Sequence, residues 1–181
     1  MKLKLYIDFD GVILNTIEIT YKRIRELYGE HASSSESSIF YRSIDWNKLL
    51  DECSPINDSI YYLKELVNSD LYDVSVLSHV LSSHESEAKL NYLNNNVPGI
   101  NFIPVMQPLP KWSSVDFKGT VLVDDFSDNL ESWQEHGGIP IKFSLKDKKY
   151  EFITIKSLEE LISLYSSLSL KVKKMKKNDH V

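Results

Sequence analysis

From residue 72 onwards the chain alternates short apolar runs with segments of helical periodicity. The apolar runs occupy residues 72–78, 101–106, 119–125, 138–143 and 151–155, and helical patterns at 82–93, 127–138 and 157–168 lie among them. Together with a first apolar run at residues 3–8, this alternation predicts parallel strands joined by helical crossovers. We therefore expect an α/β fold: a doubly wound, Rossmann-like, mostly parallel sheet with helices on both faces.

The length of 181 residues suits one core domain, expected at residues 1–170, with an insertion at about 15–58. In the insertion, Ile17, Tyr21, Ile24 and Tyr28 follow helical spacing and Gly29 is a plausible stop. The segment "ASSSESS" at 32–38 is typical of a flexible loop. A second helix is expected to begin after Ser54. We expect the insertion to form a small helical cap.

Charge and composition limit the partners and the compartment. A formal net charge of −5 makes nucleic acid an unlikely partner, and residues 171–181 are expected to be a disordered Lys-rich tail. No apolar run approaches the roughly 20 residues that span a bilayer, and the N-terminus lacks a signal-peptide pattern. With the single cysteine Cys53, these features predict a cytoplasmic protein without membrane association. The sequence holds no marker of an oligomeric state.

Polar side chains follow several predicted strands at the point where each strand ends. Asp8 and Asp10 follow the first strand, Ser78 ends the run "VSVLS", and Asp124 and Asp125 follow "TVLV". Ligands bind at the carboxyl ends of strands in such sheets. Lys111 comes shortly after another strand and adds an amine to the set. Two acidic pairs with a hydroxyl and an amine suit a hard cation such as Mg²⁺ together with a phosphate.

These residues carry a resemblance to a known superfamily. "DFDGV", the serine of "VLSHV", Lys111 and "VLVDDFSDN" resemble, in their usual order, the four motifs of haloacid dehalogenase (HAD) superfamily phosphatases. The match covers residues 5 to about 143. The pattern "VLVDDFSDNLESWQEHGGIPIKF" is similar to the 5'(3')-deoxyribonucleotidase branch.

The resemblance implies a Mg²⁺-dependent phosphomonoesterase. Asp8 would be the nucleophile that forms an aspartyl-phosphate. Mg²⁺ would be bound by Asp8, the backbone carbonyl of Asp10 and Asp125, with Asp124 as a further ligand or as an acid behind the ligands. Asp10 would protonate the departing alkoxide and then deprotonate water, which distinguishes a phosphatase from a true dehalogenase.

The resemblance also implies a phosphate-binding set. Ser78 and Lys111 would pair with phosphate oxygens, and Gly11 would let the chain turn beside the acids. Lys89 is the competitor to Lys111 as phosphate binder. His79 either reaches substrate or shapes its loop, and Asn129 is expected to orient the metal-binding acids.

Selectivity is expected to come from the cap. Phe40, Tyr41 and Trp46 either stack on a nucleobase or pack the cap on the core, and Phe9 faces either the core or the substrate. The substrate expected first is a small phosphomonoester, a nucleoside monophosphate. A nucleic-acid 3'-end phosphatase and a sugar-phosphate phosphatase are the enzymatic alternatives, and a phosphate-sensing or receiver-like protein is the non-enzymatic one.

Overall fold

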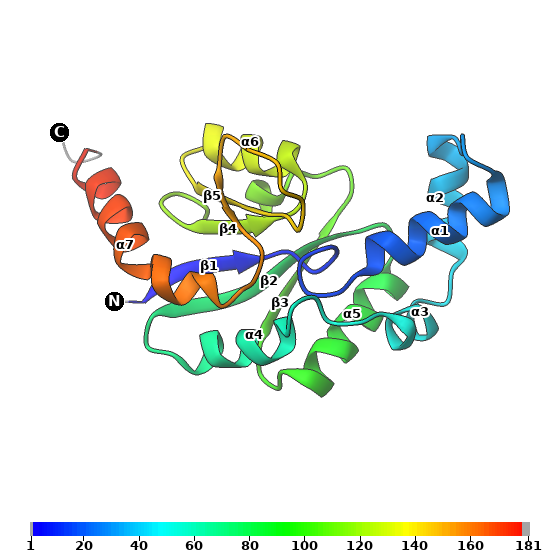
Figure 1. Cartoon of the computed structure of the whole chain (residues 1–181), viewed down its shortest axis with the longest axis horizontal. Coiled ribbons are helices and arrows are strands. Elements are labelled where there is room, and N and C mark those ends of the chain that lie inside the picture. The colour runs from blue at the N-terminus through cyan, green and yellow to red at the C-terminus, as the bar shows by residue number, and fades with distance from the viewer. Residues whose placement is uncertain (1, 179–181) are drawn as a thin grey trace.

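A computed structural model describes residues 2–178 (Figure 1). Its strands are β1 (Leu3–Ile7), β2 (Tyr72–Val80), β3 (Asn101–Met106), β4 (Val121–Asp124), β5 (Ile139–Phe143) and β6 (Ile153–Ile155). Its helices are α1 (Thr16–Tyr28), α2 (Ser34–Ser43), α3 (Trp46–Glu52), α4 (Ser59–Asn68), α5 (Ser83–Asn96), α6 (Ser127–Glu135) and α7 (Glu160–Asn178), with a short 3₁₀ helix, η1, at Lys111–Ser114. Every strand expected from the sequence is present.

The described strands form one six-stranded parallel sheet in the order β3-β2-β1-β4-β5-β6. The order reverses at β1, so the chain winds in one direction over β2 and β3 and in the other over β4 to β6. In register, Ile7 pairs with both Val76 and Val123. The polar residues that follow these three positions therefore meet at the carboxyl edge, beside the point where the strand order reverses.

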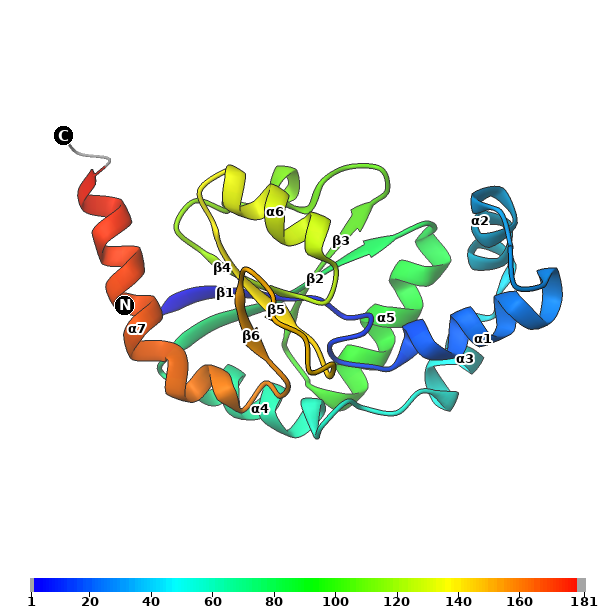
Figure 2. The ribbon, with the colours of Figure 1, turned by 45° about the horizontal axis from the view of Figure 1, so that its top comes forward.

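Helices cover both faces of the sheet, as expected. Because side chains alternate along a strand, Leu5 and Ile7 of β1 join one core while Tyr6 joins the other. The first core includes residues of α4, α5 and α7, and the second includes Leu130 and Trp133 of α6. Figure 2 shows α6 on one side of the sheet and α4 on the other. The predicted fold class is confirmed.

The helices α1, α2 and α3 form the insertion and project beyond the carboxyl edge of β1 (Figures 1 and 2). The expected loop at 32–38 is wrong: Ser33 caps α2 in a capping box with Glu36. Serines at 34, 35 and 37 lie inside the helix, because the reciprocal Ser33–Glu36 hydrogen bonds satisfy the first backbone N–H groups.

The helix expected after Ser54 begins later, at Ser59. Residues 54–56 instead pair with the chain that leaves β1. Pro55 forms a bridge with Leu14, and the backbone N–H of Ile56 donates to the carbonyl of Ile13 at 3.0 Å. This pairing joins the two ends of the insertion at its base.

The expectation of a disordered tail from residue 171 is wrong for residues 171–178, which continue α7; residues 179–181 lie outside the described part. Val172 is buried in the core shared with α4 and α5, and Met175 packs against it. Among residues 2–178, no helix combines the length and apolar character needed to cross a membrane.

Candidate active site

Three carboxylates converge where β1 and β4 end. Asp8 follows β1, Asp124 is the last residue of β4, and Asp125 follows it. Each offers an oxygen within 4.8 Å of the other two. Asp8 and Asp124 are buried, whereas Asp125 is partly exposed. The parallel register places β1 and β4 side by side, so acids distant in sequence form one cluster.

Lys111 is the cation of this cluster. Its Nζ atom lies 2.8 Å from Oδ1 of Asp8 and 2.7 Å from Oδ2 of Asp124, and it is almost fully buried. Burial lowers the pKa of this lysine, but Asp124 and Asp8 together raise it, so the ammonium stays charged. Its direct partners are thus two carboxylates, and it does not line the cavity described below.

Further contacts fix the loop that carries Asp124 and Asp125. The N–H of Phe126 donates to Oδ1 of Asp124 at 2.8 Å, and Asn129 Nδ2 donates to its Oδ2 at 3.0 Å. Lys142 of β5, also buried, donates to the backbone carbonyl of Asp125. Asn129 therefore contacts a site acid, as expected from the sequence, while the contact of Lys142 was not predicted.

The cluster holds more negative charge than its lysine compensates. Burial raises the pKa of Asp8, opposed by Lys111, and Asp124 raises it further. Burial, and next Asp124, raise the pKa of Asp125 to about 7. A bound cation would offset this crowding of oxygen ligands. The three carboxylates are therefore a candidate site for a metal ion.

Asp10 lies apart from the three-carboxylate cluster in its contacts. Its Oδ1 accepts a hydrogen bond from Thr16 at 2.7 Å, and its Oδ2 accepts from Ser78 at 3.2 Å and from Lys89 at 2.5 Å. The structure therefore brings Ser78 next to Asp10, as expected for side chains at the carboxyl ends of neighbouring strands. Ser78 is fully buried and does not line the cavity, and Thr16 had no signal in the sequence.

The backbone conformation and the close packing at Gly11 both require a glycine. Its φ of +71° lies in the left-handed region, and a Cβ at this position would stand 2.4 Å from Oδ2 of Asp125. The turn after β1 can therefore approach the acids only without a side chain, in agreement with the role expected of Gly11.

A cavity of about 690 Å³ opens between the cap and the carboxyl edge of the sheet. Asp8, Asp10 and Asp125 lie on its core side. Residues of α1 and α2 line its cap side, including Tyr21, Arg25 and Ser37. The cavity is of the size that holds a small organic ligand.

The expected cap aromatics divide into two groups. Tyr41 and Trp46 stack on each other and line the cavity, although Trp46 is buried. Phe40 is buried and lines a different, smaller groove. The prediction that Phe40 contacts substrate is therefore not supported, because its buried ring does not line the cavity beside the acids.

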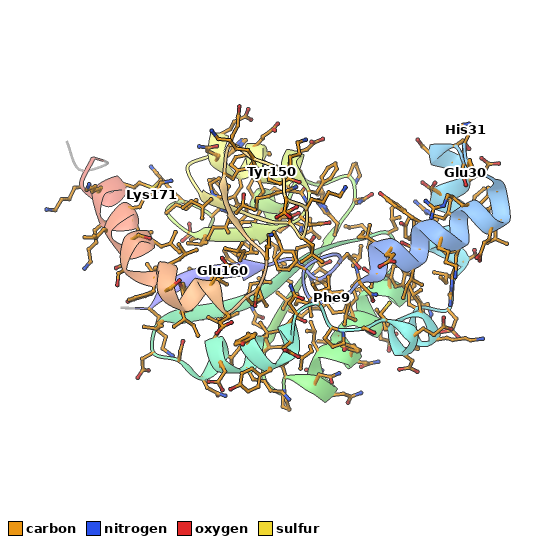
Figure 3. The ribbon with its side chains drawn as sticks, viewed as in Figure 1. Phe9, Glu30, His31, Tyr150, Glu160 and Lys171 are labelled. Atoms are coloured by element: carbon orange, nitrogen blue, oxygen red, sulfur yellow. The ribbon has the colours of Figure 1, made fainter. Side chains whose placement is uncertain are left out.

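Phe9, which is labelled in Figure 3, is fully buried. Its ring packs edge-on against that of Tyr92 in α5. It faces the core, the first of the two alternatives. The exposed rings at the cavity are Tyr21 and Phe126, which sequence reasoning missed. Phe126 directly follows Asp124 and Asp125 in the sequence, and this position was the only sequence feature that could have indicated its place at the cavity.

His79 lines the cavity, and its Nε2 lies 3.0 Å from the carbonyl oxygen of Leu109. Burial, and next the charge of Lys111, lower its pKa. Its neutral ring therefore links β2 to the segment before η1, which fits the loop-shaping alternative while leaving the ring at the cavity wall.

Comparisons with known proteins find similarity in structure but not in sequence. The sequence matches no protein-family model and no curated protein. A haloacid dehalogenase-like hydrolase from Streptococcus pneumoniae superposes with a TM-score of 0.65 at 13% identity, over 91% of this chain and 98% of that one. A HAD-superfamily hydrolase of subfamily IA from Geobacter sulfurreducens gives 0.61 at 16% identity, over 91% and 100%. This chain has the haloacid dehalogenase fold.

A magnesium-bound protein from Bacillus subtilis, described as a HAD hydrolase, gives a TM-score of 0.59 at 13% identity, over 92% of this chain and 100% of that one. At such identities the likeness concerns the fold. The resemblance inferred from the motifs is therefore supported for the fold of the superfamily. None of these three neighbours is described as a nucleotidase.

Proposed function

We propose that the protein is a Mg²⁺-dependent phosphomonoester hydrolase that works through an aspartyl-phosphate on Asp8. One observation carries this proposal: Asp8 is ion-paired with Lys111 inside the three-carboxylate cluster, while Asp10, two residues away, is held by separate partners. The two acids that phosphoryl transfer requires thus have different surroundings, which suits different roles.

The cluster fits Mg²⁺ because its donors are hard carboxylate oxygens within 4.8 Å of one another. Asp8, Asp125 and the carbonyl of Asp10 would hold the ion, with Asp124 as a further ligand or an acid behind them. When bound, it would supply charge that lets a carboxylate approach a phosphate dianion. Lys111 serves the same end by compensating Asp8 from the buried side.

In the first step an Asp8 carboxylate oxygen bonds to phosphorus and the bond from phosphorus to the ester oxygen breaks. The electron pair goes to that oxygen, which takes a proton from Asp10. In the second step water gives a proton to Asp10 while its oxygen bonds to phosphorus. The bond between Asp8 and phosphorus then breaks, which releases inorganic phosphate and restores both acids.

A nucleoside monophosphate is the substrate proposed first. The cavity beside Asp8 has room for a base and a sugar, and Tyr21, Tyr41 and Phe126 offer rings along its wall. Contacts between a base and an aromatic ring contribute about 1–3 kcal/mol each. Lys171 of α7 lies at the opposite side of the molecule from the cap tip at Glu30 and His31 (Figure 3), so the Lys-rich helix lends no support to a nucleic-acid end phosphatase.

The test is hydrolysis of a phosphomonoester panel with and without Mg²⁺. The panel holds ribo- and deoxyribonucleoside 5'- and 3'-monophosphates, sugar phosphates and a 3'-phosphorylated oligonucleotide. We expect Mg²⁺-dependent turnover, highest on a nucleoside monophosphate, that is abolished by Asp8→Asn. The matched control is Asp128→Asn, the same change at an exposed position of α6.

Turnover that persists in Asp8→Asn would exclude the covalent mechanism. A preference for sugar phosphates would retain the chemistry and reject the nucleotide assignment. Turnover without Mg²⁺, undiminished by a chelator, would reject the metal.

A further inference from the structure

Lys89 of α5 is a fully buried lysine at the edge of the site. Its Nζ atom lies 2.5 Å from Oδ2 of Asp10 and 2.7 Å from Oε1 of Glu85, and it also contacts the carbonyl of His79 and the hydroxyl of Ser78, at 3.1 and 3.3 Å. A buried ammonium is tolerated only with such partners. Lys89 takes no part in the two proposed phosphoryl-transfer steps.

Lys89 separates two acids that would otherwise share a buried region without compensation. Asp10 and Glu85 both line the cavity, whereas Lys89 does not. Glu85 is itself fixed, because its Oε2 accepts a hydrogen bond from the N–H of Leu81 at 2.8 Å. The ammonium therefore lies between one carboxylate that is anchored to the loop after β2 and one that must exchange protons.

The same ammonium also contacts the cap. It lies 5.2 Å from the ring centroid of Trp46 in α3 and 5.5 Å from that of Phe9. Both distances are typical of cation–π contacts. Thr16 at the start of α1 holds the other oxygen of Asp10, so the orientation of Asp10 depends on contacts from α1 and α5 together with Ser78 of β2. Helix α5 in turn packs on the cap.

We propose that Lys89 is a positioning residue that holds Asp10 in the orientation from which it exchanges protons with the leaving group and with water. This inference rests on the proposed phosphatase function. The burial of Lys89 behind the cavity wall argues against direct contact with substrate phosphate, so its effect passes through Asp10. Glu85 holds the ammonium in place.

The nature of the leaving group tests this role. An alkoxide needs a proton from Asp10 as its bond to phosphorus breaks, whereas 4-nitrophenolate is stable enough to depart without one. The ratio kcat/KM covers the steps up to enzyme phosphorylation. A defect in positioning Asp10 should therefore lower kcat/KM for an alkyl phosphate far more than for 4-nitrophenyl phosphate.

The experiment compares wild type, Lys89→Met, Asp10→Asn and the double variant on both esters with Mg²⁺. We expect Lys89→Met to lower kcat/KM at least about tenfold more for the alkyl ester than for the aryl ester. The inhibition constant of inorganic phosphate should change less than about threefold. In the Asp10→Asn background, Lys89→Met should have no further effect on the alkyl ester, because residues that act through one group are not additive.

Two further variants keep the test decisive if Lys89→Met fails to fold, as judged by circular dichroism. Lys89→Arg keeps the charge and should restore part of the activity on the alkyl ester. Glu85→Gln/Lys89→Met removes one buried carboxylate along with the lysine, and it should fold and still show the selective alkyl defect.

Equal losses on both esters in a folded variant would overturn the inference and leave the phosphatase proposal intact. A loss confined to KM, with weaker inhibition by phosphate, would overturn it in favour of direct phosphate binding. Absence of turnover of both esters by wild type, or turnover that survives Asp8→Asn, would overturn the proposed function and this inference together.

Discussion

The Nζ atom of Lys111 lies 2.8 Å from Oδ1 of Asp8, and both side chains are buried. Replacing Lys111 by methionine leaves Asp8 facing Asp124 without compensation. We expect kcat/KM for a phosphomonoester to fall by about 10²–10³, and the protein to lose about 3–5 kcal/mol of stability without Mg²⁺. Steady-state kinetics and urea unfolding measure the two effects. Lys64→Met, an exposed change on α4, is the control, and turnover near the wild-type level in Lys111→Met would reject the role of the pair.

Gly11→Ala should damage the proposed metal site through Asp125. A Cβ at residue 11 would stand 2.4 Å from Oδ2 of Asp125, so that carboxylate must move. Gly99, at φ +84°, has open space around it, which makes Gly99→Ala a control with backbone strain alone. We expect the backbone strain to cost each variant about 1–2 kcal/mol of stability. Only Gly11→Ala should also lose most of its turnover and most of the rise in Tm that we expect Mg²⁺ to produce in wild type. Equal responses to Mg²⁺ in the two variants would contradict this account.

The strand-end residues could be predicted from the sequence because parallel register leaves little freedom. Once β1 and β4 are neighbours, Asp8 and Asp124 must end at the same edge. Which lysine faces which acid could not be predicted in this way. Lys111 lies in η1 and Lys89 in α5, and the tilt of each helix and its distance from the sheet decide which acid the long side chain reaches. Tilt and distance depend on tertiary packing, for which the local sequence has no signal.

Phe126 should contribute to substrate binding, whereas Phe40 should contribute to stability. Phe126 is 56% exposed and lines the cavity beside the acids, whereas Phe40 is only 4% exposed and does not line it. We expect Phe126→Ala to raise KM for the proposed nucleoside monophosphate substrate about 5- to 150-fold with kcat nearly unchanged. Phe40→Ala should lower Tm and leave KM within about twofold. A raised KM in Phe40→Ala, together with a lowered Tm and unchanged KM in Phe126→Ala, would show that the cap presents its other face to substrate.

The start of α2 and the end of α7 were not predicted as helix, although the local sequence contains helix signals at both places. Ser33 and Glu36 have capping-box spacing, which predicts a helix and not a loop. In α7, Leu168, Val172 and Met175 follow the spacing of one helical face, and this face packs on the core although lysines surround it. In both places local composition suggested disorder, while periodicity and capping favoured the helix that the structure contains.

His79 should make stability depend on pH. Its pKa is lowered in the folded protein from an ordinary value of 6.5, chiefly by burial. Above that value the ring is neutral in both states, but as pH falls through it the unfolded chain takes up a proton that folded His79 resists. Wild type should therefore lose stability relative to His79→Gln as pH falls from about 8 to 5, by at most about 1.4 kcal/mol per unit of pH. Urea unfolding across this range measures the difference, with His84→Gln, an exposed change on α5, as the control. A difference that is flat, or that grows as pH rises, would show that folded His79 accepts a proton as readily as the unfolded chain does.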